Sequence, residues 1–307
     1  MLLILLGVIV GIILPVQTSI NARLQKTVGS PFVVSFITFT VGTIFLAIVT
    51  LIQIKTLLVP LTLIENQPFW IWIGGLLGVF YLTTNILLFP KLGSIQTVIM
   101  PILGQILMGL VIDQFGLFYS MESKMTVVKF LGAMLVVAGV LVAIVLKSML
   151  EHQVSYTQKS KGLNLWRLIG LIAGMLSATE SAINGHLEVV LKSSEQASFI
   201  SFLVGAIALL IIVLILRPNL QQIKSSQNSV WWSWSGGIIG ALFVLGNVFL
   251  VPILGTGLTV IIVIVGMMIG GIIIDQFGLF GSPKKPTTLI QILGLAMMIV
   301  GVVMIKL

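Results

Sequence analysis

The sequence contains no cysteine and few charged residues, and these two shortages exclude several classes of protein. Without cysteine, the chain is neither a disulfide-stapled domain nor an enzyme with a catalytic thiol. Only 8% of the residues are charged, against about 25% in an ordinary soluble domain. The two histidines and eight acidic residues leave little from which to build a catalytic or metal site. We therefore predict that the protein is not an enzyme and holds no metal or cofactor.

Apolar residues dominate instead. They make up 58% of the 307 residues, and the mean hydropathy is +1.21. A net charge of +8 would favour nucleic-acid binding in a soluble protein. Here the lysines and arginines lie almost entirely between apolar runs, where they orient helices relative to a membrane. We predict that the lipid bilayer surrounds this protein and that it does not bind nucleic acid.

The apolar runs are long enough to cross a bilayer, whose core of about 30 Å takes roughly 20 helical residues. We predict an all-α integral membrane protein with ten transmembrane helices. The expected spans of the first half are 2–21, 32–53, 69–89, 95–112 and 126–146, and those of the second half are 166–185, 197–216, 231–251, 257–274 and 287–305.

The two halves of the chain repeat one another. With a shift of 163 residues, Gly7–Gly42 aligns with Gly170–Gly205 without a gap. With a shift of 162 the match resumes and ends in the hexapeptide Asp-Gln-Phe-Gly-Leu-Phe, which occurs at both 113–118 and 275–280. The sequence therefore predicts three parts: a five-helix repeat at 1–146, a cytoplasmic linker at 147–165 and a second five-helix repeat at 166–307.

An odd number of spans in each repeat predicts an inverted arrangement, because the second copy must enter the membrane from the opposite side. Inverted repeats recur in secondary transporters, where exchanging the conformations of two similar halves exposes a central site to either side. The loops after odd-numbered spans hold eleven Lys and Arg residues and the other side holds five. This bias places the odd-numbered loops in the cytoplasm and both termini outside.

One ionisable residue lies well inside a predicted span. Glu180 is about two-thirds of the way along 166–185, where a charged side chain is costly and marks a candidate functional site. On a helical wheel it flanks a face that contains Gly174 and Asn184, and Gln17 occupies the matching place in the first span. A buried carboxyl can hold a proton and release it in favour of a cation. The plainer alternative is a neutral, hydrogen-bonded and chemically idle acid.

Polar residues recur at matching depths in the two halves. Asn21 matches Asn184, and Asn85 matches Asn247. We predict that these asparagines and Gln17 provide hydrogen bonds around a substrate and proton site at Glu180. The alternative is that they bridge helices, as buried asparagines can. The glycine clusters are predicted to be packing surfaces that let helices approach closely.

Two carboxylates lie at the ends of spans rather than inside them. Asp113 and Asp275 occupy the two identical hexapeptides, which the inverted arrangement places on opposite sides of the membrane. A carboxylate near water costs little there, so we predict a helix-end or gating role rather than contact with substrate.

The opening of the sequence resembles a known family. Residues 11–24, GIILPVQTSINARL, followed by Ser35-Phe36 and Phe39-x-x-Gly42, resemble the signature of the YdcZ branch of the drug/metabolite transporter superfamily, and the second half repeats it in weaker form. The resemblance implies a fused pair of five-helix proteins that transports small molecules across the bacterial inner membrane. In the small multidrug resistance proteins of this superfamily, a membrane-embedded glutamate in the first helix binds a proton or a cation. Glu180 is the analogous residue here, whereas the first half has Gln17.

These observations predict a secondary active transporter that exports a small organic cation or a neutral metabolite by proton antiport. Two alternatives remain open. One is a non-transporting membrane component or regulator that acts through a partner, and the other is a passive facilitator. The sequence also leaves open whether the protein is a monomer or a homodimer.

Overall fold

The computed structural model of the chain describes residues 1–146, 163–218, 230–281, 284 and 286–306. Within these residues the regular structure is entirely helical. This agrees with an all-α membrane protein, because a helix satisfies its backbone hydrogen bonds internally when it crosses lipid. Of the predicted linker 147–165, residues 147–162 lie outside the described residues. Its last three residues, 163–165, belong to the first helix of the second half.

The helices follow the predicted spans, with short helical turns between them. In the first half they are α1 (Leu2–Val28), α2 (Pro31–Ile54), α3 (Leu61–Asn66), α4 (Gly74–Phe115) and α5 (Val127–Leu141), which a π-helical turn extends to Leu146. In the second half they are α7 (Leu163–Leu191), α8 (Ser194–Leu216), α10 (Gly236–Leu254), α11 (Thr256–Phe277) and α12 (Leu289–Lys306). The 3-10 turns are Phe69–Trp72, Leu117–Tyr119, Trp231–Ser235 and Leu279–Gly281.

Eight helices of the described chain are long and apolar enough to cross a membrane. They fall on eight of the ten predicted spans, and α4 contributes one of them through Val98–Phe115. The apolar part of α12, Leu289–Ile305, is a shorter helix. The structure therefore shows a polytopic membrane protein, and the count of ten spans stays a prediction.

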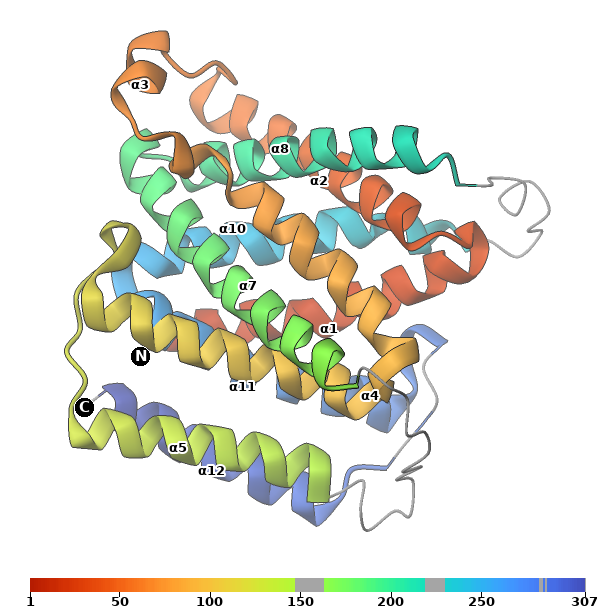
Figure 1. The fold of residues 1–307 in the computed structure, drawn as a ribbon, viewed down its shortest axis with the longest axis vertical. Coiled ribbons are helices and arrows are strands. Elements are labelled where there is room, and N and C mark those ends of the chain that lie inside the picture. Colours follow the sequence, from red (N-terminus) through yellow and green to blue (C-terminus); the bar gives the residue numbers. More distant parts are fainter. Residues whose placement is uncertain (147–162, 219–229, 282–283, 285, 307) are drawn as a thin grey trace.

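The break that the sequence predicts between 69–89 and 95–112 is absent, because α4 is helical over all 42 residues. At 1.5 Å per residue a straight helix of this length would be about 63 Å long, roughly twice the bilayer core. Figure 1 shows how α4 fits, since its ribbon turns back on itself partway along. In the second half the matching helices are separate, because Gly255 adopts a φ of 83° between α10 and α11.

The two halves interlock rather than lie side by side. The first helix of each half packs against the opposite half: α1 lies on α10 and α11, and α7 lies on α4. The close approaches match as well. Gly11 of α1 lies against the backbone at Val263, and Gly174 of α7 lies against the backbone at Pro101, which occupies the corresponding position of the other repeat.

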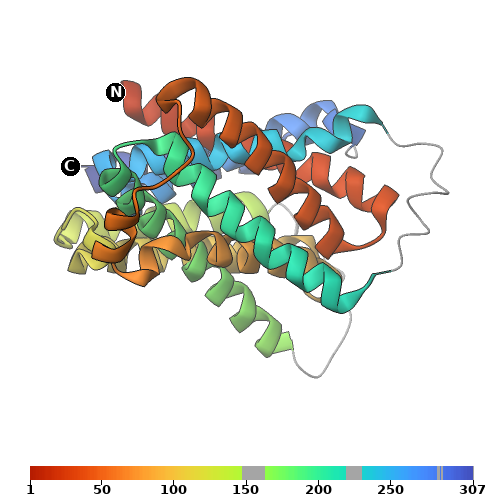
Figure 2. The ribbon, with the colours of Figure 1, turned by 90° about the horizontal axis from the view of Figure 1, so that it is seen from above.

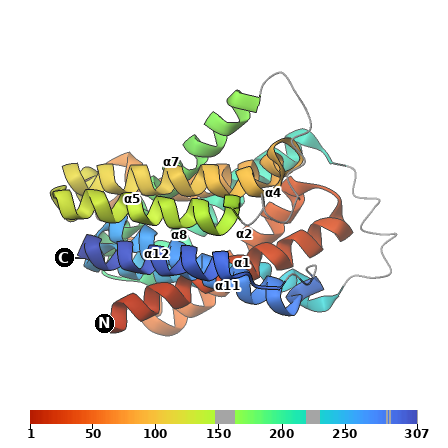
Figure 3. The same ribbon diagram turned by 90° about the horizontal axis from the view of Figure 1, so that it is seen from below.

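The outer helices also pair across the halves. Helix α2 packs on α8, and Figure 2 shows this pair on one face of the bundle. Helix α5 packs on α12, and Figure 3 shows this pair from the opposite face. The start of α1 and the end of α12 lie at the same end of the bundle (Figure 1). Six interlocked helices thus enclose the centre of the protein: α1, α2, α4, α7, α8 and α10.

Candidate functional site

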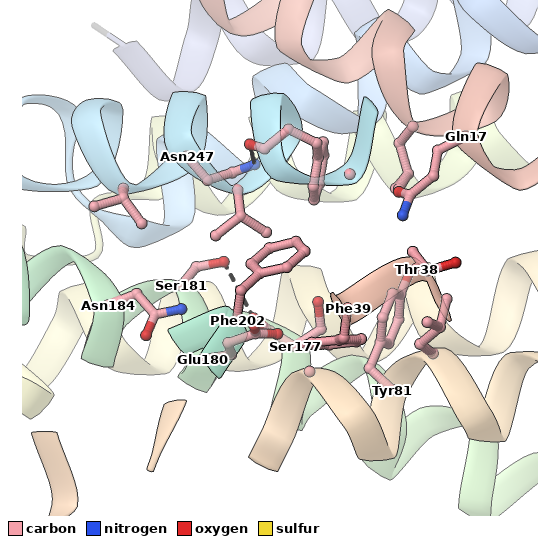
Figure 4. Close-up of a pocket in the computed structure, with 17 residues that line it drawn as sticks. Gln17, Thr38, Phe39, Tyr81, Ser177, Glu180, Ser181, Asn184, Phe202 and Asn247 are labelled. Carbon is pink, nitrogen blue, oxygen red and sulfur yellow. Dashed lines mark hydrogen bonds between the residues drawn. The ribbon is translucent and has the colours of Figure 1, made fainter. Parts of the chain in front are cut away.

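A cavity of about 80 Å³ lies where the two halves meet, and its walls come from these six central helices. Sites for drug-sized ligands usually measure about 300–1,000 Å³, so this conformation leaves room only for a small molecule. Figure 4 shows Gln17 and Asn247 on one side of the cavity and Glu180, Ser177 and Tyr81 on the other. Three phenylalanines form apolar parts of the cavity wall: Phe39, Phe202 and Phe243.

Among the described residues of the cavity wall, Glu180 is the only one with a carboxyl group. It lies on α7 and is half-buried. Within the described part of the chain, its carboxyl takes part in no hydrogen bond or ion pair. The described residues of the wall also include no lysine, arginine or histidine. The cavity therefore presents an uncompensated acidic group, which favours a proton or a cationic ligand over an anion.

One helical turn further along α7, Asn184 is held by its neighbours. Its side chain is 2% exposed, and its Nδ2 donates a hydrogen bond to Ser201 Oγ at 3.0 Å. The matching residue of the first half has the mirrored arrangement, because Asn21 Oδ1 accepts a hydrogen bond from Thr38 Oγ1 at 3.1 Å. These two asparagines join the first and second helices of their own halves, in line with the helix-bridging alternative.

Gln17 lies at the place in α1 that Glu180 occupies in α7. Its amide is 7% exposed and points into the cavity (Figure 4). Within the described residues it makes no hydrogen bond. The cavity therefore has two poles, a carboxyl from the second half and a carboxamide from the first.

Glycines of the opposite half make room for both poles. A methyl group added at Gly78 would overlap the carboxyl of Glu180, and one added at Gly240 would overlap the amide of Gln17. One turn away, Gly74 and Gly236 leave the same space for the two asparagines on α7 and α1. The sequence predicts that the glycine clusters are helix-packing surfaces. These four glycines accommodate polar side chains, whereas Gly75 and Gly237 of the same clusters lie against the backbone of neighbouring helices.

The two asparagines of the other predicted pair, Asn85 and Asn247, lie in different places. Asn247 lines the cavity, and its Nδ2 donates to Phe243 O at 2.9 Å. Asn85 lies outside the cavity wall, beside the hydroxyl of Tyr81, and its buried Oδ1 has no hydrogen-bond partner. The structure thus brings Glu180, Gln17, Asn184 and Asn247 to the cavity and leaves Asn21 and Asn85 behind it.

Two residues of this region were not predicted from the sequence. Gln105 on α4 is 7% exposed, and its Nε2 donates to Ser177 Oγ at 3.0 Å. Ser177 lines the cavity one turn before Glu180. The signal that could have found Gln105 is its amide in the apolar run 95–112, where a polar side chain needs a partner.

Asp113 lies away from the cavity and joins the two halves at the end of the bundle. Its carboxylate accepts hydrogen bonds from the backbone N–H groups of Thr256 at 2.8 Å and Gly257 at 2.9 Å. These are the first residues of α11, so an acidic group of one half caps a helix of the other. The position fits the predicted helix-end role.

The second copy of the hexapeptide repeats the local fold of the first. Gln114 Oε1 accepts a hydrogen bond from Met125 N, and Gln276 Oε1 accepts one from Thr287 N. Asp275 also has a partner in the structure. Within the described residues, no group of three or more His, Asp or Glu side chains could hold a metal ion.

Comparison with known proteins places this architecture in a family. The family model described as "Putative inner membrane exporter, YdcZ" matches residues 2–142 and again residues 165–304. The comparison with curated proteins gives no match.

The fold also occurs among solved structures. One, described as "Crystal structure of protein", has a TM-score of 0.67 to this chain, with 16% sequence identity. The likeness covers 99% of this chain and 94% of the other. At this level of identity it shows a shared fold.

Proposed function

Because this chain belongs to the YdcZ family of inner membrane exporters, we propose that it is a secondary active transporter that exports a small organic cation or a neutral metabolite in exchange for protons. The observation that carries the proposal is the carboxyl of Glu180, which has no partner among the described residues and lies in a small cavity between the two halves. Such a group can bind either a proton or a cation, and competition between the two couples their movements.

The arrangement of the helices supports transport by alternating access. We propose that the chain crosses the membrane ten times, as two inverted five-helix repeats. The first part of α4 and the helix α12 would add two crossings to those of the eight apolar helices. An even number of crossings would leave both chain ends on one side of the membrane. The matched contacts of Gly11 and Gly174 support two equivalent halves that can exchange conformations.

The first experiment measures proton movement in proteoliposomes that contain a pH-sensitive dye, with a panel of cationic and neutral metabolites. Wild-type protein is compared with Glu180→Gln. The control is Glu188→Gln, the same chemical change on the same helix but outside the cavity wall. We expect substrate-dependent proton flux from the wild type and the control, and a loss of at least about tenfold in Glu180→Gln.

The same experiment separates the alternatives. Full proton flux in Glu180→Gln would reject Glu180 as the coupling residue. Uptake of a labelled compound without proton flux would identify a passive facilitator. No flux of any kind from purified, folded protein would favour a membrane component that acts through a partner.

A further inference from the structure

The polar side chains that line the cavity divide into those with a hydrogen-bond partner and those without one. Six of them bond to other residues: Thr38, Tyr81, Ser177, Ser181, Asn184 and Asn247. Among the described residues, the other two, Gln17 and Glu180, have no partner. They occupy matching positions in α1 and α7. The polar side chains of the described wall that lack a partner are therefore one pseudo-symmetric pair.

Burial makes the missing partner of Gln17 informative. Its side chain is 7% exposed, and its amide points into the cavity (Figure 4). A carboxamide has two N–H donors and one carbonyl acceptor. Groups of this kind are almost always hydrogen-bonded when buried, because burial removes their bonds to water. The amide of Gln17 is therefore placed to bond a polar group inside the cavity.

The rest of the wall limits the shape of a ligand. Apart from the polar side chains, the described wall consists of glycine and apolar residues: Leu14, Phe39, Gly78, Leu82, Phe202, Gly240, Phe243, Val244 and Val248. The cavity measures about 80 Å³. A ligand that satisfies both poles therefore has a short apolar body with one polar group at each end.

The charges of the wall limit the second polar group to a neutral one. Glu180 favours a cationic group at its own pole. A carboxylate or phosphate on the same molecule would have no counter-ion, because the described wall includes no lysine, arginine or histidine. The amide of Gln17 can both donate and accept, which matches a hydroxyl group.

We propose that the cavity binds a small amino alcohol, with the ammonium group at Glu180 and the hydroxyl group at the amide of Gln17. Gln17 then determines specificity between an amino alcohol and a plain alkyl amine of the same size. A site that hydrogen-bonds a hydroxyl rejects the analogue without it, because the buried amide is left unpaired. This inference rests on the proposed function, in which Glu180 binds the cation.

The test compares three straight-chain amines of equal length: aminopropanol, butylamine and diaminopropane, which end in a hydroxyl, a methyl and a second amine. Ligand-observed NMR measures their binding to purified protein in lipid nanodiscs at neutral pH, with empty nanodiscs as the blank. The homologues with one carbon fewer are measured in parallel, so that chain length does not decide the result. We expect the wild type to bind the amino alcohol at least about tenfold more tightly than the alkyl amine.

Two variants change the group at the second pole. Gln17→Met removes the amide and nearly keeps the size of the side chain, so the preference for the amino alcohol should disappear or reverse. Gln17→Glu adds a second carboxylate, which should make the diamine bind at least about tenfold more tightly than the amino alcohol. This variant keeps the test valid if Gln17→Met folds poorly. The matched control is Gln25→Met, on the same helix but outside the cavity wall, which should keep the wild-type preference.

The outcomes separate this inference from the proposed function. Equal binding of the amino alcohol and the alkyl amine by the wild type would overturn the inference alone. So would a preference that persists in Gln17→Met, or a Gln17→Glu variant that does not favour the diamine. Glu180→Gln should lose at least about tenfold in affinity for every amine. Full binding by Glu180→Gln, or no binding of any amine by the wild type, would reject the cation pole and the inference together.

Discussion

Glu180 and Gln17 occupy matching positions in the two halves, and each lies against a glycine of the opposite half. The two side chains have nearly the same size, and they differ in whether they can ionise. The site is therefore close to twofold symmetric in shape, but only the second half contributes an ionisable group to it. If Glu180 binds the proton or cation as proposed, a single carboxyl restricts this binding to one pole of the cavity.

The space at Gly78 can be tested by filling it. We expect Gly78→Ala to lower proton-coupled transport by about tenfold or more, because the added methyl group displaces the Glu180 carboxyl. Proteoliposome flux provides the measurement. The control is Gly271→Ala on α11, where an added methyl group has no neighbour within 4 Å. Wild-type transport by Gly78→Ala would show that transport does not require the Glu180 carboxyl to lie beside Gly78.

At this scale the sequence predicts charged groups better than neutral ones. Glu180 stands out because a carboxyl in an apolar span is costly, and the repeat then indicates Gln17 and Asn184. Gln105 carries no charge and its counterpart is Met267, so neither argument identifies it. Its hydrogen bond to Ser177 depends on the contact between α4 and α7, which brings together residues 72 positions apart. No local pattern contains that contact.

At the scale of helices, Asp113 connects the end of α4 to the start of α11. A backbone bond from Ser123 N to Asp113 O, 2.7 Å long, fixes the turn that follows α4. The hydroxyls of Ser120 and Thr256 lie 3.0 Å apart across the same junction. We propose that this junction is a gate element, since it must loosen if the two halves exchange conformations.

We expect Asp113→Asn to loosen the start of α11. An asparagine cannot accept both N–H groups as a carboxylate does, and it has no charge to favour the helix N-terminus, so the change should cost about 1–2 kcal/mol. Hydrogen exchange of the peptide around Thr256 and Gly257 should become faster. Glu122→Gln, a change of an exposed carboxylate in the same connection, is the control. Unchanged exchange in Asp113→Asn would reject the cap.

The pattern of apolar runs predicts the helices well and their ends less well. Each predicted span overlaps a helix of the structure, because hydropathy reports burial in lipid over about 20 residues. The predicted gap between 89 and 95 fails for a physical reason: a helix that bends keeps most of its backbone hydrogen bonds, which are needed in a membrane. Gly255 makes a true break because its φ of 83° is outside the helical range.

At the scale of the molecule, the two halves depend on each other. The first helix of each half packs on helices of the other half, α1 on α10 and α11 and α7 on α4, so the cavity wall combines residues of both repeats. The internal repeat predicts this symmetry. It does not predict the interlocking, because a repeat in sequence is equally compatible with two separate bundles.

The orientation of the molecule in the membrane is the last prediction. The excess of Lys and Arg in the odd-numbered loops places them in the cytoplasm. Because the chain has no cysteine, single cysteines report topology without background. Thr62→Cys lies on exposed α3 and Lys26→Cys lies on the exposed last turn of α1. We expect a membrane-impermeant thiol reagent to label Thr62→Cys in intact cells and Lys26→Cys only after permeabilisation. The opposite pattern would reverse the orientation, and labelling of both in intact cells would indicate that the chain inserts in both directions.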